Sequence, residues 1–319
     1  MKIPPIIRSV FEIFPLKSYN PEFEEHSAPE DIYNFVSRDN LEQTREEFTL
    51  AVHNVRGISL SGVTKFVPTD PTGLTAALVL CLRNDLLLPN ERLGNKTRHG
   101  LIPLSHLASP TRELPILLET DNGKNSCITI SPMLNINKSS NKSFLESILN
   151  EFLDSLNDLW TLVLLADALN ADCSVLKSLF HRDPELKDDN IISRSIDYKL
   201  SGEMQSWNKF AARHPNILSS PSSTFNSVKN WAFLPSEDHK ALEQMYQSKL
   251  AEFEKFVPLF LSHLSSVGNS ISKDIIELKF VSFMICVEYF LPPDTQLSLT
   301  CKKNFNGALE YSKRVLMKF

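Results

Sequence analysis

The sequence predicts an α/β domain followed by an all-helical domain. Short strand-like runs end before residue 142, and apolar residues at helical spacing dominate after residue 143. A chain of 319 residues is long enough for roughly two domains of ~150 residues each. The predicted organisation is an N-terminal extension over 1–50, an α/β domain over 51–142 and a helical domain over 143–319 with a loop-rich insertion around 183–235.

The predicted extension combines an apolar cluster with a charged stretch. Phe11, Phe14, Pro15, Leu16 and Tyr19 show no clear period, and residues 22–45 are rich in charge. We therefore expect compact order to begin near residue 51.

The first half of the α/β domain contains two strand-like runs around a helix. Residues 63–67 alternate as a strand does, and residues 74–83 place their large apolar side chains on one helical face. Residues 86–89 read as a second short strand. Residues 90–99 are predicted to form a polar, basic loop, and residues 101–106 a short bridging segment.

A proline within an apolar run marks the second half of this domain. Pro115 lies in residues 113–119, and proline cannot donate to a sheet ladder, which excludes the interior of a central strand. A cis bond at the strand entrance resolves the conflict, so Pro115 is predicted to be a structural cis-proline. Asp121-Asn122-Gly123 then predicts a hairpin turn, residues 127–130 a short strand, and Ser131-Pro132 the start of a helix.

The C-terminal half is predicted to contain only helices. A capping box at Ser143 precedes a long buried helix, and Asp172 begins a shorter helix through residue 180. Ser236 caps a helix that continues past residue 255 with a kink at Pro258. Residues 275–291 form a buried helix that ends at Pro292-Pro293, and residues 300–319 form the last helix.

Composition and spacing exclude several classes of function. A net charge of −5 gives no strong attraction to nucleic acid or to an acidic membrane. No histidine spacing fits a metal site, so no metal ligand is predicted. The five cysteines are widely spaced and include no Cys-x-x-Cys, which is typical of reduced core thiols. The longest apolar run, residues 280–291, is shorter than the ~20 residues that span a bilayer, so any membrane association is expected to be peripheral.

The order of Leu-Pro strand, hairpin, short strand and helix resembles the second half of a thioredoxin-like domain of the glutathione-transferase type. That family needs a Tyr, Ser or Cys after its first strand, where this chain offers Thr69 and Thr72. It also needs a Glu or Gln before the serine that follows the hairpin, where Ile130 precedes Ser131. Because isoleucine makes no hydrogen bond to a ligand, we expect glutathione chemistry to be lost. No catalytic residue and no cofactor are predicted, and a divergent glutathione-dependent transferase is the alternative.

Several short motifs together resemble the metaxin-like subunits of the mitochondrial sorting and assembly machinery, a transferase-shaped family without transferase activity. The motifs lie, in order, at residues 14–19, 52–55, 69–89, 114–117, 278–286 and 315–319. The resemblance implies a noncatalytic, peripheral protein on the cytosolic face of the mitochondrial outer membrane. It implies three partners: a membrane-embedded β-barrel subunit, a second metaxin-like subunit and β-barrel precursor proteins.

The apolar cluster of the extension then has two interpretations. Phe14, Pro15, Leu16 and Tyr19 either pack on their own domain or dock onto the partner barrel. A third hypothesis for the whole chain is an interaction module of another complex, such as a translation factor. The absence of a strongly basic composition disfavours that hypothesis.

Overall fold

The computed structural model describes most of the chain from residue 32 onward. The described residues are 32–38, 47–90, 96–104, 109, 114–121, 124–129, 144–168, 175, 179, 214, 236–266 and 271–319. Contacts divide the chain into one unit over Met1–Ile32 and a second over Tyr33–Phe319, and all elements below belong to the second unit.

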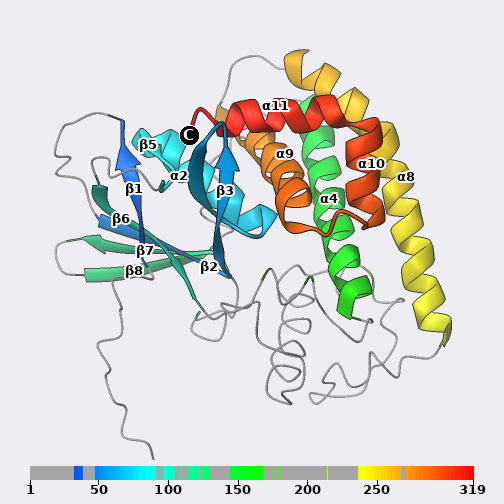
Figure 1. Ribbon diagram of the computed structural model, residues 1–319, viewed down its shortest axis with the longest axis horizontal. Coiled ribbons are helices and arrows are strands. Elements are labelled where there is room, and N and C mark those ends of the chain that lie inside the picture. Colours follow the sequence, from blue (N-terminus) through cyan, green and yellow to red (C-terminus); the bar gives the residue numbers. More distant parts are fainter. Residues whose placement is uncertain are drawn as a thin grey trace, which may run out of the picture. The chain divides into compact units, whose positions relative to one another are not determined.

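A mixed six-stranded sheet forms the first part of this unit (Figure 1). Its order is β5-β1-β6-β2-β7-β8, in which β2 and β6 are parallel and all other neighbours are antiparallel. The bounds are β1 Tyr33–Ser37, β2 Glu47–Val52, β5 Leu86–Leu87, β6 Lys96–Pro103, β7 Ile116–Asp121 and β8 Lys124–Thr129. A separate hairpin pairs β3 Val55–Leu60 with β4 Val63–Pro68.

Helix α2, Pro71–Asn84, follows the β3–β4 hairpin and lies in sequence between the two parallel strands. Its start has the chemistry that helix termini favour: Asp70 is the N-cap and Pro71 occupies the first turn. Asp85 closes the helix in the left-handed region, with φ of 52°. The predictions of a strand at 63–67 and a helix at 74–83 are confirmed.

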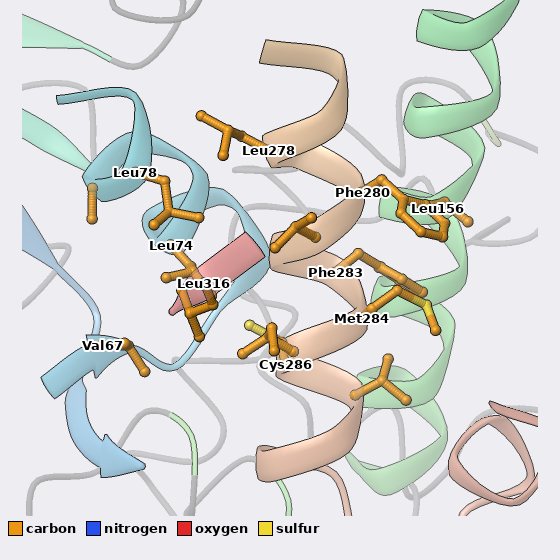
Figure 2. Close-up of a cluster of buried hydrophobic side chains, with 14 of the residues drawn as sticks. Val67, Leu74, Leu78, Leu156, Leu278, Phe280, Phe283, Met284, Cys286 and Leu316 are labelled. Atoms are coloured by element: carbon orange, nitrogen blue, oxygen red, sulfur yellow. The ribbon is translucent and has the colours of Figure 1, made fainter. Parts of the chain in front are cut away.

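The described part of the chain after the sheet contains the helices α4 Phe144–Ala168, α8 Ser236–Ser266, α9 Ile271–Phe290, α10 Gln296–Asn304 and α11 Asn306–Leu316. Helix α9 is buried on several sides and packs against α2, α4, α10 and α11. Figure 2 shows α9 between α2, which contributes Leu74 and Leu78, and α4, which contributes Leu156. One continuous apolar core therefore joins the sheet to the helices.

The central position of α9 explains the apolar run that the sequence contains. Phe280, Phe283 and Met284 point toward α4, whereas Leu278 and Cys286 lie toward α2 (Figure 2). The run is a core helix, since burial on several sides removes the polar face of an ordinary surface helix. None of the helices that the structure describes combines the length and apolar character needed to cross a membrane.

The structure corrects three expectations. Compact order begins before residue 51, because β1 and the first half of β2 belong to the sheet and Phe35 and Leu50 are fully buried. Residues 96–103, expected as loop and bridging segment, form β6 between β1 and β2. Pairing on both sides holds these polar residues extended, and tertiary context overrides their weak strand pattern. The predicted strand at 86–89 is the two-residue β5 at the sheet edge.

The last predicted helix is also two helices. Phe305 lies between α10 and α11, and its N–H donates to the carbonyl oxygen of Cys301 at 2.9 Å. Helix α8 begins at Ser236 and continues past residue 255 as predicted, with Pro258 inside it, and the kink stays a prediction. The helices expected after Ser131 and Asp172 and the insertion at 183–235 lie largely outside the described residues. The division into extension, α/β domain and helical domain stays a prediction.

Candidate functional site

The residues that follow β2 lie beside the start of α2. The Thr69 N–H donates to the carbonyl oxygen of Asn54 at 3.1 Å, although the β3–β4 hairpin separates them in sequence. His53, Asn54, Thr69 and Asp70 are all buried here. We call these four residues the polar junction.

Pro115 stands at the entrance of β7, which pairs with β2 through Ala51 and Ile116. The Leu114–Pro115 peptide bond is cis, as the sequence analysis expected. Both Leu114 and Pro115 are buried.

The Thr69 side chain forms a hydrogen bond with the helical part of the chain. Its Oγ1 donates to the carbonyl oxygen of Leu179 at 2.6 Å, and the residue is fully buried. Thr72 lies half-buried in the first turn of α2. The interpretation of residues 69–71 as a helix start is confirmed, and the Thr69 hydroxyl is committed to a structural bond.

Asp70 is the one acidic residue of the polar junction, and its pKa is shifted. Its Oδ1 accepts a hydrogen bond from the Gly73 N–H at 2.7 Å, while Oδ2 has no hydrogen-bond partner in the described part of the chain. Burial raises the pKa of the Asp70 carboxyl to about 6. Its charge also helps to raise the pKa of the Cys286 thiol on α9, after the larger effect of burial. Asp70 therefore caps α2 where that helix packs on α9.

The buried cysteines lack the environment of a nucleophile. Burial raises the pKa of Cys81 and Cys286 well above the ordinary thiol value and that of Cys301 to about 12. Such thiols stay protonated and inert near neutral pH. Cys127 on β8 is exposed, and Cys173 lies outside the described residues.

The residues that the structure describes also lack the arrangements that histidine or metal chemistry would need. His99 stacks on Phe48 with ring centroids 4.1 Å apart, and its Nδ1 accepts from the Phe48 N–H at 3.3 Å. Burial lowers the pKa of His99, which favours its neutral form. The imidazole ring packs in the core against Phe48. No group of His, Cys, Asp and Glu in this part of the chain is arranged to hold a metal ion.

Several sequence-predicted positions cannot be placed. Ile130, Ser131 and the four predicted docking residues Phe14, Pro15, Leu16 and Tyr19 lie outside the described residues. Their roles stay predictions.

The surface offers features that the sequence analysis did not find. No described strand pairs with the outer edge of β8, where Ser126 and Cys127 are exposed. On α8, Phe256 and Leu259 are 41% and 51% exposed, and on α10 Leu299 is 54% exposed. Each of these three lies on a helix that also buries an apolar face, and single-sequence periodicity does not reveal which further residues stay uncovered.

Fold and site together define a mixed α/β sheet joined to a helical bundle, with a polar junction used for capping and packing. Two comparisons with known proteins show what this chain resembles. Residues 1–119 match the family model described as SAM35, subunit of the SAM complex. The chain also resembles the sorting assembly machinery 35 kDa subunit of Saccharomyces cerevisiae, with 26% identity over 307 residues that cover 89% of this chain and 88% of the relative.

These matches confirm the resemblance that the sequence motifs predicted. The motifs resemble the 35 kDa subunit in particular. The matched residues 1–119 include the opening at 14–19 and the strand entrance at Pro115.

Proposed function

We propose that this chain is a noncatalytic, peripheral subunit of the mitochondrial outer-membrane sorting and assembly machinery, where it helps to recognise and insert β-barrel precursor proteins. The observation that carries the proposal is the similarity to the yeast 35 kDa subunit along 89% of the chain. The family model over residues 1–119 supports it independently.

We further propose a glutathione-transferase-like fold. Four neighbouring strands, β6-β2-β7-β8, have a parallel pair joined through α2 and then an antiparallel hairpin, which is the order of a thioredoxin-like sheet. Strands β1 and β5 extend that sheet at one side, and the β3–β4 hairpin is inserted before α2. Helices α4 to α11 then correspond to the helical domain of a transferase.

The polar junction supports a binding role over catalysis. Thr69 donates to Leu179, Asp70 caps α2, and burial keeps the nearby Cys286 thiol protonated. We therefore propose that the chain acts by binding other proteins through its surface. The proposed partners are the membrane-embedded barrel subunit, the second metaxin-like subunit and β-barrel precursors, on the cytosolic face of the outer membrane.

The outer edge of β8 fits an extended precursor strand. An extended peptide can add to an exposed sheet edge through main-chain hydrogen bonds, with alternate side chains giving specificity. Phe14, Pro15, Leu16 and Tyr19 are proposed to dock onto the barrel subunit.

Native purification from mitochondria tests the proposal. We expect the tagged chain to be released from mitochondria by carbonate and to co-purify with an outer-membrane β-barrel protein. The combined Phe14→Ala, Leu16→Ala and Tyr19→Ala variant should lose that partner, whereas Phe11→Ala serves as the control. A chain that is free in the cytosol, or that is retained on immobilised glutathione unless Thr69 and Thr72 are substituted, would favour the transferase alternative.

Cys127 allows a direct test of the β8 edge. A precursor with one cysteine in its last strand should form a crosslink to Cys127. The matched control carries Cys127→Ser together with Ala251→Cys, which moves the thiol to an exposed position on α8. Equal crosslinking at both positions would argue against strand addition at β8.

A further inference from the structure

Helix α10 has one buried and one exposed face. Leu297, Ser298 and Cys301 are buried, and they turn toward the rest of the helical bundle. Leu299, Lys302 and Lys303 are exposed, and Leu299 is the most exposed large apolar side chain in the described part of the chain. At 3.6 residues per turn these three positions fall within an arc of about 100°. We call them the α10 face.

The α10 face belongs to a C-terminal segment that is basic in an otherwise acidic protein. Residues 296–319 contain five basic residues and one acidic residue, whereas the whole chain has a net charge of −5. Figure 1 shows α10 turning directly into α11. The positive charge of both helices is thus concentrated at one end of the chain.

The two lysines of the α10 face have no ion-pair partner among the residues that the structure describes. Lys313 on α11 pairs with Glu288 at 3.2 Å and with Glu310 at 3.1 Å. Neither Lys302 nor Lys303 forms an ion pair with any residue that the structure describes. Their charges remain available to an external anion.

We propose that the α10 face docks on a bilayer surface that carries anionic headgroups. A projecting leucine can insert at the headgroup boundary of a bilayer, and the lysines beside it are attracted to anionic headgroups. The lysine stems cover apolar surface while their ammonium groups reach the phosphates. An acidic protein surface would satisfy the lysines but offers no general partner for Leu299, so the lipid surface is favoured.

The interaction is weak by itself. A basic residue near an anionic membrane contributes roughly a fivefold gain in affinity, so the two lysines together give about thirtyfold. Such a contact orients a protein that other subunits already hold at the membrane, because tethering raises its effective concentration. As a statement about the outer membrane the inference rests on the proposed function, whereas lipid binding itself does not.

Vesicle flotation of the purified full chain tests this surface. We expect binding to phosphatidylcholine vesicles that contain phosphatidylserine, little binding to phosphatidylcholine alone, and a loss of binding at high salt. The double variant Lys302→Gln/Lys303→Gln should bind about thirtyfold more weakly. Leu299→Ser should also bind more weakly, although its charge is unchanged. All three side chains are exposed, so the variants should keep the circular dichroism spectrum and unfolding midpoint of the parent.

Lys240→Gln/Lys255→Gln is the matched control, because it removes the same charge from exposed positions on α8. Equal loss of binding in both double variants would reduce the effect to net charge and overturn the proposal. Absence of binding to the anionic vesicles, with lysine-dependent retention on immobilised polyglutamate, would overturn it in favour of an acidic protein partner. Co-purification with the barrel protein would persist in either case, so the proposed function would survive. Vesicle binding without co-purification would contradict the proposed function and leave the docking surface intact.

Discussion

The N–H of Leu88 donates a hydrogen bond of 2.7 Å to the main-chain oxygen of Phe319, which ties the C-terminal residues to the strand region of the fold. The Arg38 guanidinium lies 5.9 Å from the centre of the Phe319 ring and donates to the carbonyl oxygen of Lys318 at 2.7 Å. The Lys65 ammonium group donates to the carbonyl oxygen of Leu316 at 3.3 Å. Residues 316–319 thus form a clasp between α11 and the sheet.

Substitution of Phe319 measures the strength of this clasp. Phe319 is 6% exposed, and Phe319→Ala removes a buried ring and its contact with the Arg38 guanidinium. We expect the free energy of unfolding to fall by about 3 kcal/mol. Urea unfolding of the purified chain gives this value. Lys318→Ala is the control, since that side chain is exposed, and equal losses in the two variants would contradict a specific role for the ring.

Asp70 predicts a pH dependence of stability. Its pKa is raised from 3.8 to about 6 in the fold, so the folded state holds a proton that the unfolded state has released between these values. Stability from this group is present below pH ~4 and falls as the pH rises to ~6, by about 3 kcal/mol in total.

The variant Asp70→Asn keeps a side-chain oxygen for the Gly73 N–H and removes the titration. We expect the difference in unfolding free energy between variant and parent to shift in favour of the variant between pH 4.5 and pH 7, by about 2 kcal/mol of the ~3 kcal/mol total. Urea unfolding at both values measures it. A difference that is the same at both values would show that Asp70 does not titrate with a raised pKa.

Two glycines predict opposite effects of alanine. A Cβ at Gly73 would lie 2.6 Å from Asp70 Oδ2 and 3.1 Å from Pro68 Cβ, so Gly73→Ala must displace the cap and should cost about 1–3 kcal/mol. A Cβ at Gly307 in α11 meets nothing within 4 Å, and Gly307→Ala should stabilise by about 0.5–1 kcal/mol. Thermal unfolding of both variants separates the predictions. A Gly73→Ala variant as stable as the parent would refute the close contact with Asp70.

The cysteines are expected to differ sharply in reactivity. In a Cys173→Ser background, maleimide should label Cys127 in the native protein and spare Cys81, Cys286 and Cys301, whose thiols are buried and protonated. Labelling followed by peptide mass spectrometry identifies the sites, and denaturation should expose all four. Rapid native labelling at Cys286 would mean that α9 opens readily from α2.

Long periodic segments and turn chemistry were predicted well from the sequence. The buried run at 275–291 became α9 because its length and apolar character permit no other element, and the hairpin followed from the two residues between Asp121 and Lys124. Strand β6 was missed because its polar side chains hide a pattern that only pairing with β1 and β2 imposes. Strand β2 was not predicted to be the first strand of the parallel pair. For that reason, His53 and Asn54 were not recognised as neighbours of Thr69.

The site was only partly predictable for similar reasons. The helix start at Asp70 is a local signal, but the partner of Thr69 is Leu179, 110 residues away. The α10 face was missed because the last helix was expected to begin at residue 300. That boundary left Leu299 outside the helix and concealed its shared face with Lys302 and Lys303.

The central position of α9 also sets an order of events during synthesis. Helices α2 and α4 are synthesised more than a hundred residues before α9 is complete. The apolar sides of both helices stay uncovered until α9 packs against them. Nascent chains with such uncovered surface aggregate readily, which is the hazard that chaperones reduce. We therefore expect completion of this core to be a late step in the folding of the newly made chain, which depends on chaperones to shield the apolar sides of α2 and α4 until α9 packs between them.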